Sequence, residues 1–483
     1  MQRGVTEGFT RTSKRAALAV ATFGAFMTPF DGSVVTLALP SIGRELGGDV
    51  VSLGWVATAY VLGLTICVIP FGRLADIRGR RLVYVLGVAL FTLASALCGL
   101  APSLTSLIAT RFLQGVAAAM MAGNAIALLS EVFPANERGK ALGINTAAVY
   151  VGLALGPSVG GILVEELGWR SVFYVNVPIG VFVIALALLK IQPETIEKRG
   201  ERLDPVGIVT YGLALSMILL GLTFSEGGGP VWPRSLMVAG FALLALFIFF
   251  ETRVASPLLD VRLFRNAPFA FSTLTALLNY SSVFGVAFIM SLYLQLIPGF
   301  GAEQAGFILL AQPVMMAGFS PVGGWLSDRV EPRIVASIGM AVVSASIYAL
   351  SRLGAASEWW DIAVRLMALG TGHAFFSSPN TNATMSSVAK RQYGVAAAIL
   401  STMRFTGQAI SLAIATSVLA AQLGGAAVSA ASGERIPVEA FMTGMRIALN
   451  ILAGICAAGV LTSLVRGTAR SAPKLETETV END

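Results

Sequence analysis

The chain has 483 residues, of which 55% are hydrophobic and 12% are charged. Soluble globular proteins carry about twice that charged fraction, so the composition excludes a soluble protein held by a single anchor and indicates a polytopic helical membrane protein. The net charge of +6 does not indicate nucleic-acid binding, because the sequence has no large patch of basic and aromatic residues. The three cysteines lie inside apolar runs, and their spacing indicates neither disulfide bonds nor a metal site.

Apolar runs long enough to span a bilayer recur along the whole chain. A spanning helix needs about 20 mostly apolar residues, and we predict fourteen spans, of which the eighth is the shortest. The first run follows a basic segment, as in a signal peptide, but it is too long for a signal core. The predicted spans are 16–39, 51–71, 82–101, 106–130, 141–164, 172–190, 205–223, 235–250, 269–297, 304–326, 334–350, 361–387, 393–421 and 440–465.

Lysines and arginines are distributed unequally between the two sides of these spans. An even number of spans places both termini on one side of the membrane. If that side is the inside, the inner loops and tails hold 24 of the 33 lysines and arginines, and the outer loops hold five. Positive charge accumulates in cytoplasmic loops, so the sequence predicts cytoplasmic termini. Four arginines remain inside spans, namely Arg111, Arg365, Arg404 and Arg446.

Two similar turns indicate an internal repeat. The turn at 72–81 follows the second span and contains four arginines, and a second turn with glycine, aspartate and arginine occurs at 324–329. Asp76 in the first turn corresponds to Asp328 in the second, 252 positions later. Two repeats are typical of secondary transporters. We therefore predict an N-terminal six-helix bundle, an insert with two spans, a C-terminal six-helix bundle and a disordered cytoplasmic tail, at residues 1–191, 192–266, 267–466 and 467–483.

Five short motifs are similar to the signatures of one transporter family. They are Asp31–Pro40 in the first span, the turn at 72–81, Arg111–Gly115 in the fourth span, Gly152–Gly161 in the fifth and Trp169–Gly180 at the start of the sixth. On these motifs the chain resembles the fourteen-helix drug:proton antiporter group of the major facilitator superfamily over nearly its whole length. The resemblance implies an all-α fold with two six-helix bundles related by pseudo-two-fold symmetry and two inserted central helices. It also implies a monomeric, multi-pass protein of a prokaryotic cytoplasmic membrane.

Asp31 is the only carboxylate deep inside a predicted span. A charge in hydrocarbon costs several kcal/mol, so an acidic residue there indicates a polar pathway or a paired site. Arg111 is the expected partner, because a rise of about 1.5 Å per helical residue places both residues in the outer half at similar depth. We predict that this pair carries proton coupling, with His373, the only histidine, as a second proton site. The alternatives are a static ion pair for Asp31 and Arg111 and a packing role for His373.

The stretch 152–161 combines glycines at four-residue spacing with a proline. Glycines let neighbouring helices approach closely, and a proline inside a helix removes a hydrogen-bond donor. We predict a flexible, tightly packed contact between the two halves, and ordinary glycine packing is the alternative. The stretch also matches the G-x-S-x-G pattern of hydrolases, but that pattern needs a strand, a turn and a histidine partner. The residues of this antiporter motif are Gly152, Gly156, Pro157, Gly160 and Gly161.

The basic turn at 72–81 is predicted to act as a conformational latch on the cytoplasmic side. Asp76 is expected to accept hydrogen bonds from the N-terminus of the thirteenth span, where an anion is favoured. Arg80 and Arg81 are expected to pair with Glu131 at the inner end of the fourth span. The second copy lacks the basic ending, and a solvated run of charges is the alternative for both. The latch residues are Gly72, Asp76, Arg80, Arg81, Glu131 and Asp328.

Polar and aromatic residues inside spans are predicted to line a substrate cavity. Arg404 and Gln408 lie one turn apart on one face of the thirteenth span, and Arg404 resembles an arginine typical of the antiporter group. Each residue alone also fits a hydrogen bond between helices, so the prediction applies to the set. The set comprises Trp55, Tyr60, Asn124, Asn145, Tyr150, Asn279, Gln312, Asn380, Asn382, Arg404 and Gln408.

The charges deep inside the spans indicate which substrate charge is favoured, because the spans contain one carboxylate, Asp31, and three arginines, Arg111, Arg365 and Arg404. A net-positive interior disfavours permanent dications and favours neutral, weakly basic or anionic amphipathic compounds. The predicted function is export of such drug-like compounds by proton antiport with alternating access. It uses protons and the proton-motive force, needs no other cofactor or metal, and takes place in the lipid bilayer.

Three other functions are weighed against this one. The first is a narrow-specificity exporter of a native metabolite, such as a lipid, a siderophore or a self-made antibiotic. The second is a membrane sensor that binds a ligand without transporting it. The third is a membrane enzyme, for which the spans supply one histidine and no cluster of acidic residues, so that no catalytic set is visible.

Overall fold

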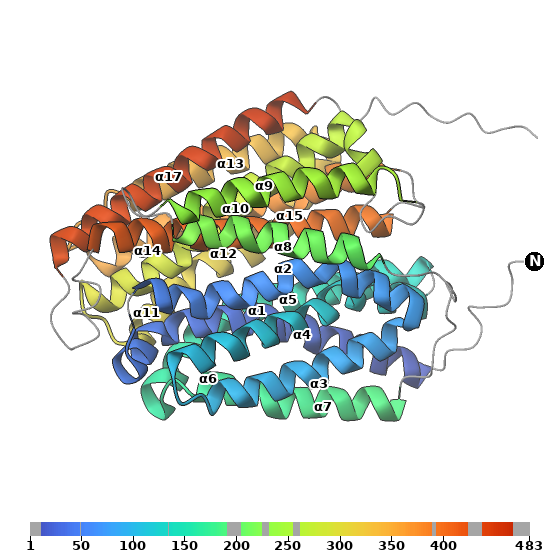
Figure 1. Ribbon diagram of the computed structural model, residues 1–483, viewed down its shortest axis with the longest axis horizontal. Coiled ribbons are helices and arrows are strands. Elements are labelled where there is room, and N and C mark those ends of the chain that lie inside the picture. Colours follow the sequence, from blue (N-terminus) through green and yellow to red (C-terminus); the bar gives the residue numbers. More distant parts are fainter. Residues whose placement is uncertain are drawn as a thin grey trace, which may run out of the picture.

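Figure 1 shows the computed structural model of the chain, in which long helices run side by side. The structure describes residues 11–48, 50–133, 135–190, 204–224, 231–254, 261–388, 393–423 and 437–466. Within these ranges every regular element is a helix. The chain begins and ends its helical part at the same end of the molecule, where α1 starts and α17 stops, and we call the opposite end the outer end.

Seven helices precede the central insert and form the N-terminal group. In this group α1 packs against α5, and α4 packs against both α2 and α3. The predicted sixth span is divided into α6 and α7, which are separated only by Val175. The group comprises α1 (Arg11–Leu46), α2 (Val50–Arg78), α3 (Arg80–Gly99), α4 (Leu104–Val132), α5 (Ala135–Leu167), α6 (Ser171–Tyr174) and α7 (Asn176–Lys190).

The C-terminal group follows a short 3-10 helix, η1 (Val261–Arg265). Here α10 packs against α15 and α17, and α14 packs against α12 and α13. The predicted tenth span is again divided, because only Leu310 separates the end of α11 at Leu309 from the start of α12 at Ala311. The group comprises α10 (Ala267–Leu296), α11 (Ala302–Leu309), α12 (Ala311–Arg329), α13 (Pro332–Leu350), α14 (Trp359–Ser386), α15 (Tyr393–Leu423) and α17 (Val438–Val465).

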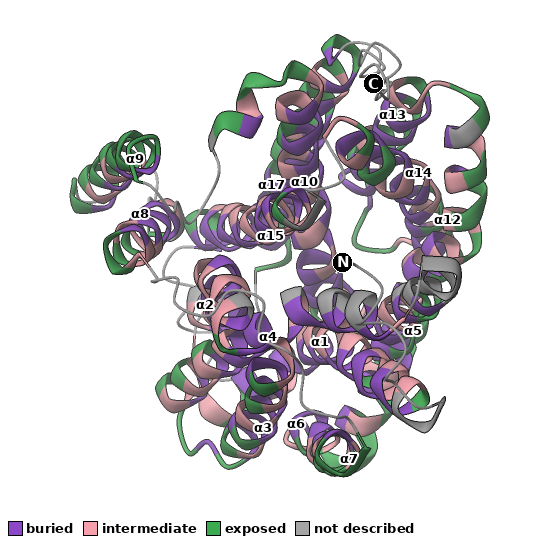
Figure 2. Ribbon diagram, turned by 90° about the vertical axis from the view of Figure 1, so that its right-hand side faces the viewer, coloured by how far each residue is buried: buried purple, intermediate pink, exposed green. Residues whose placement is uncertain are grey.

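The two inserted helices, α8 (Pro205–Thr223) and α9 (Trp232–Glu251), form a pair at the edge of the molecule (Figure 2). The pair attaches through α8, which packs against α2 and α15. The Tyr211 hydroxyl donates to the Thr65 carbonyl oxygen at 3.5 Å, and the Ser417 hydroxyl donates to the Leu222 carbonyl oxygen at 3.0 Å. Most of the exposed residues of α9 are apolar, as expected of a helix that faces lipid.

Thirteen helical segments of the described residues are long and apolar enough to cross a membrane. They include the eighth predicted span, which is a helix of 20 residues. The twelfth predicted span, 361–387, is absent from that set although it forms α14, a helix of 28 residues packed within the C-terminal group. Its mean hydropathy is lowered by polar residues, among them Asp361 and Arg365, which pair with each other within α14. Arg365 and Asn380 also contact other helices, through the carbonyl oxygens of Ala349 on α13 and Ser272 on α10.

Helices of the two groups meet near the outer end. There α5 packs against α11, α2 against α15 and α1 against α10. The Ser291 hydroxyl on α10 donates to the Thr36 carbonyl oxygen on α1 at 2.9 Å. The Glu165 carboxylate on α5 accepts a hydrogen bond at 3.0 Å from the backbone amide of Glu303, in the first turn of α11. An acidic group is stabilised at a helix N-terminus, so this contact helps to hold the outer ends together.

Candidate functional site

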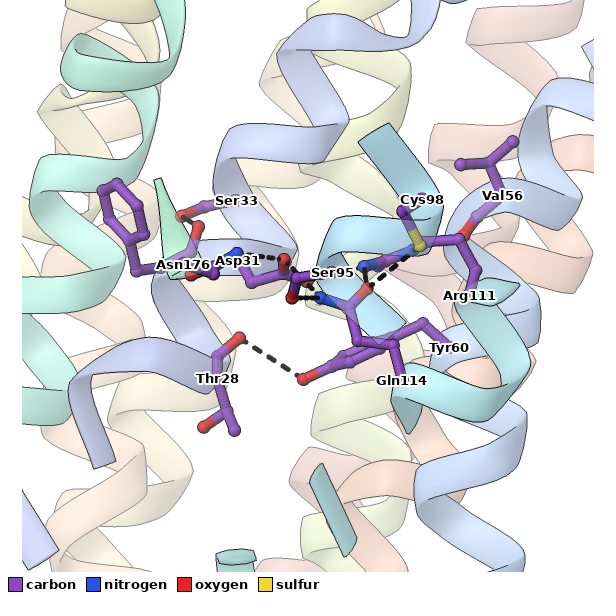
Figure 3. Close-up of polar contacts among 12 residues, drawn as sticks. Thr28, Asp31, Ser33, Val56, Tyr60, Ser95, Cys98, Arg111, Gln114 and Asn176 are labelled. Atoms are coloured by element: carbon purple, nitrogen blue, oxygen red, sulfur yellow. Dashed lines mark hydrogen bonds and ion pairs between the residues drawn. The ribbon is translucent and has the colours of Figure 1, made fainter. Parts of the chain in front are cut away.

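Asp31 on α1 and Arg111 on α4 form a buried ion pair (Figure 3). The Arg111 Nη1 atom lies 2.6 Å from the Asp31 Oδ2 atom, and the two side chains are 1% and 0% exposed. The pairing that helix depth predicts is therefore confirmed. Removing one member of a buried pair leaves an uncompensated charge and costs about 3–5 kcal/mol, so each residue holds the other in place.

The side-chain amides of two further residues contact the carboxylate, and the sequence predicts neither contact. The amide nitrogens of Gln114 on α4 and Asn176 on α7 donate to Asp31 Oδ1 at 2.9 and 2.8 Å. The Gln114 amide nitrogen also donates to the Ser95 hydroxyl on α3 at 2.8 Å. Every group that contacts the carboxylate is a donor, so Arg111, Gln114 and Asn176 together hold it in place.

Arg111 is also anchored to α2. Its Nε atom donates to the Val56 carbonyl oxygen at 3.0 Å. Its guanidinium carbon lies 4.3 Å from the centre of the Tyr60 ring, a favourable distance for a cation and an aromatic face. The Tyr60 hydroxyl reaches the Thr28 carbonyl oxygen on α1 at 3.5 Å. The ion pair thus connects α1, α2 and α4 through one cation.

A close approach of α2 and α4 brings Tyr60 and Arg111 together, and it depends on Gly115. A β-carbon at this position would lie 2.0 Å from the Tyr60 carbonyl oxygen. We expect Gly115→Ala to destabilise the protein by about 1–3 kcal/mol, because overpacking displaces backbone. Thermal unfolding of the purified protein in detergent measures this loss. Gly454→Ala is the control, since a β-carbon on Gly454 meets nothing within 4 Å, and an equal loss in both variants would contradict the packing argument.

The antiporter motif faces two different helices. β-Carbons on Gly152, Gly156 and Gly160 would contact α1, at 2.5 Å from the Phe26 carbonyl oxygen, 1.7 Å from Ser33 Oγ and 3.0 Å from Val34 respectively. A four-residue spacing keeps these glycines on one helix face, and that face packs inside the N-terminal group. The predicted contact between the halves comes from the other face of α5.

That other face carries Gly161 and Pro157, which approach α11 of the C-terminal group. A β-carbon on Gly161 would lie 2.6 Å from the Ala302 carbonyl oxygen, and one on Gly306 would lie 2.1 Å from the Pro157 carbonyl oxygen. Helix α5 continues without interruption through Pro157. The motif therefore combines packing within one half with a close contact between halves.

The latch prediction is only partly within the described residues. The side chains of Asp76, Glu131 and Asp328 lie outside the described residues. Residues 389–392, just before α15, where Asp76 is expected to bind, lie outside them as well. Gly72 lies within α2, with space around it. The Arg81 Nη2 atom donates to the Ala187 carbonyl oxygen at 3.3 Å, near the end of α7. The pairing of Arg80 and Arg81 with Glu131 stays a prediction.

Arg365 on α14 is balanced by its own helix, which changes the charge count made from the sequence. Its Nη2 atom lies 2.7 Å from Asp361 Oδ2, and its Nε atom donates to Asp361 Oδ1 at 3.0 Å. Asp361 is the first residue of the predicted span 361–387 and is therefore not among the charges deep inside the spans. The i, i+4 spacing of the two residues is a recognised helical pairing, so the sequence did contain this signal.

His373 and Arg404 are brought together around Tyr280. The ring centres of Tyr280 on α10 and His373 on α14 are 5.4 Å apart, and the Arg404 guanidinium carbon on α15 lies 5.1 Å from the Tyr280 ring centre. These contacts belong to the C-terminal group, whereas Asp31 belongs to the N-terminal group. The role of His373 as a second proton site stays a prediction.

Other residues of the predicted cavity set do not meet in one place. Trp55 stacks on Phe224, the residue after α8, and therefore lies against the inserted helices. Asn380 donates to the Ser272 carbonyl oxygen at 3.1 Å and accepts from Arg466 at 3.0 Å, so protein groups occupy both ends of its amide.

The remaining members of the set fall into four kinds. Some contact protein groups in their own half, one contacts the opposite half, two are buried with unpartnered amide atoms, and two are half-buried. Asn124 donates to the Met120 carbonyl oxygen, and Asn382 donates to the Ser327 hydroxyl. Tyr150 accepts from Ser320 across the halves at 3.4 Å. Asn145 and Asn279 are buried with unpartnered amide atoms, and Gln312 and Gln408 are half-buried.

Spanning helices around an ion pair deep in the membrane define a multi-pass membrane protein of the transporter type. The family model of the Major Facilitator Superfamily matches residues 21–412, and the chain belongs to this superfamily. A solved bacterial homologue of the human lysosomal transporter Spinster, inward-facing and unoccupied, has a TM-score of 0.72 and 16% identity over 95% of this chain and 98% of that one. The predicted all-α major facilitator fold and the cell-membrane location are confirmed.

Curated relatives with higher sequence identity are transporters too. The riboflavin transporter RibZ of Clostridioides difficile is 30% identical over 85% of this chain and 89% of its own length. Multidrug resistance protein Stp of Mycobacterium tuberculosis is 34% identical over 83% and 75% of the two chains. Cephamycin export protein CmcT of Amycolatopsis lactamdurans is 34% identical over 96% of each chain. The chain is therefore a transporter related to exporters of small molecules.

Proposed function

We propose that the chain exports amphipathic, drug-like compounds across the cytoplasmic membrane in exchange for protons. The observation that carries the proposal is the buried site of Asp31, whose carboxylate is held by Arg111 and by two amides. An ionisable residue inside the membrane marks a proton or substrate pathway by default. The similarity to a multidrug resistance protein and an antibiotic exporter supports the direction and the substrate class.

Protonation of Asp31 is the proposed coupling step. A proton on one carboxylate oxygen removes the negative charge that holds Arg111. The three donors around the carboxylate, from Arg111, Gln114 and Asn176, then face an uncharged group that accepts hydrogen bonds less well. Arg111 also holds α2 through Val56 and Tyr60, and α2 packs against α15 of the other half. Helices α2 and α15 are in close contact near the outer end, because a β-carbon on Gly54 of α2 would lie 2.0 Å from the methyl carbon of Thr416 on α15. Proton uptake thereby shifts the balance between outward-open and outward-closed forms.

The proton gradient is sufficient for concentrative export. One proton that moves inward through about 100 mV contributes about 2.3 kcal/mol. This free energy supports an approximately fifty-fold concentration ratio of a neutral substrate, because each factor of ten needs about 1.4 kcal/mol. A pH gradient adds to the same driving force.

Proteoliposomes with an imposed pH gradient test the proposal. We expect several unrelated dyes and drugs to dissipate the gradient through the purified protein, and we expect protein-free liposomes to retain it. Substrate movement without proton movement would reject antiport and leave an uncoupled transporter. No response to any compound of the panel would reject the drug-like substrate class.

A second candidate is export of a single native metabolite. It is favoured by the similarity over 96% of both chains to a protein named for export of cephamycin. A single responsive compound in an otherwise inactive panel would support this candidate, whereas competition between unrelated compounds would support the first.

A further inference from the structure

Arg404 differs from the two paired arginines inside the spans. Arg111 is paired with Asp31, and Arg365 is paired with Asp361. The contacts of Arg404 among the described residues are with the rings of Tyr280 and Phe405, and its Nε atom is buried without a hydrogen-bond partner. An uncompensated cation at this depth is costly. A negatively charged ligand group would supply the missing counter-charge.

His373 gives a second, independent indication at the same place. Its side chain is 3% exposed, its Nδ1 atom has no hydrogen-bond partner, and its ring stands edge-on to Tyr280. A buried polar atom without a partner destabilises the protein, and a ligand that hydrogen-bonds to it would remove that cost. Arg404 and His373 therefore present two unsatisfied nitrogens from different helices around one tyrosine ring.

The depth and exposure of these residues fit a ligand site. Tyr280 and His373 each lie 13 residues from the inner end of their helix, and Arg404 lies 11 residues from the inner end of α15. At about 1.5 Å per residue, the three residues lie at similar depth, far from either membrane surface. Arg404 and Tyr280 are partly exposed, in contrast to the fully buried Asp31 site. A ligand therefore has access to the arginine and none to the ion pair.

We propose that Arg404, His373 and Tyr280 form the subsite for an acidic group on an amphipathic aromatic substrate. The acid, a carboxylate or a group of similar charge, pairs with the Arg404 guanidinium and lies within reach of His373. The partly exposed rings of Tyr280 and Phe405 supply apolar and aromatic surface for the rest of the substrate. This inference rests on the proposed export of amphipathic compounds and narrows their class to organic anions.

A matched pair of probes tests the subsite by binding alone, without a proton gradient. The probes are pyrene-1-butyrate and its neutral amide, and the full-length protein is held in nanodiscs with empty nanodiscs subtracted. We expect the wild-type protein to bind the carboxylate at least about tenfold more tightly than the amide, because hydrogen bonds to charged groups contribute about 1.5–3 kcal/mol. Arg404→Gln should remove this preference and leave the affinity for the amide unchanged. His373→Gln should selectively weaken the binding of the carboxylate probe, by a smaller factor than Arg404→Gln does.

Arg446→Gln is the matched control, because Arg446 is an exposed arginine inside the α17 span, and this variant should bind both probes as the wild type does. If Arg404→Gln lowered the affinity for both probes equally, Arg404 would have a structural role, and the proposal would be overturned. Absence of a carboxylate preference in the wild type would overturn it as well. Neither outcome depends on proton coupling, so failure of the subsite and failure of proton antiport are distinguishable.

Discussion

Asp31→Asn is expected to abolish substrate-driven proton movement in proteoliposomes, to the level of liposomes without protein. Asparagine retains the size of the side chain but accepts no proton in the membrane. Substrate binding without a gradient should change by less than about tenfold, or about 1.4 kcal/mol, because the fully buried carboxylate is not accessible to a ligand in this conformation. Fluorescence of a trapped pH indicator during substrate addition measures the proton movement.

Loss of stability is separated from loss of coupling by a second variant. Asp31→Asn leaves Arg111 buried without its counter-charge, at a cost of about 3–5 kcal/mol. The double variant Asp31→Asn/Arg111→Gln removes both charges, so it should be more stable than the single variant and equally uncoupled.

Asp361→Asn serves as the matched carboxylate control, because Asp361 is partly exposed and pairs with Arg365 on its own helix. This variant should remain coupled. If Asp31→Asn still moves protons with substrate, Asp31 is not the coupling acid, and His373 becomes the next residue to replace.

The sequence predicts the ion pair because charges inside spans are rare. Asp31 has few possible partners, and helix depth selects Arg111 among them. Gln114 and Asn176 are different, because amides are common in spans and pair with many groups. Both residues lie in motifs that the sequence analysis identified, yet their contacts with Asp31 depend on how α4 and α7 are rotated. That rotation is set by packing against several neighbours at once.

The antiporter motif shows the same limit for glycine. Four-residue spacing predicts a close helix contact, and the structure contains it. The spacing does not identify the neighbour, and three of the glycines face α1 of the same half. The contact with the other half comes from Gly161, which is one residue and therefore about 100° away from Gly160 on the helix.

Gly306→Leu is expected to prevent closure of the outer end and to abolish transport. Helices α5 and α11 approach closely across the halves where Gly306 faces Pro157 and Gly161 faces Ala302. A leucine at 306 must separate these helices, and the hydrogen bond from the Glu303 amide to Glu165 is then lost with them. Overpacking of this kind costs about 1–3 kcal/mol. Because the cost applies only to forms in which the outer end is closed, outward-open forms become more populated.

Labelling of Ser291→Cys by a membrane-impermeant maleimide measures this shift. Ser291 is fully buried against Thr36 when the outer end is closed, and Cys67→Ser removes a partly exposed native thiol. We expect the labelling rate from outside to rise about tenfold or more in Gly306→Leu, in line with the free-energy cost above. Gly318→Leu on α12 is the control, since a β-carbon there meets nothing within 4 Å. Unchanged labelling together with normal transport in Gly306→Leu would mean that the halves separate elsewhere, and the contact between α5 and α11 would then have no part in gating.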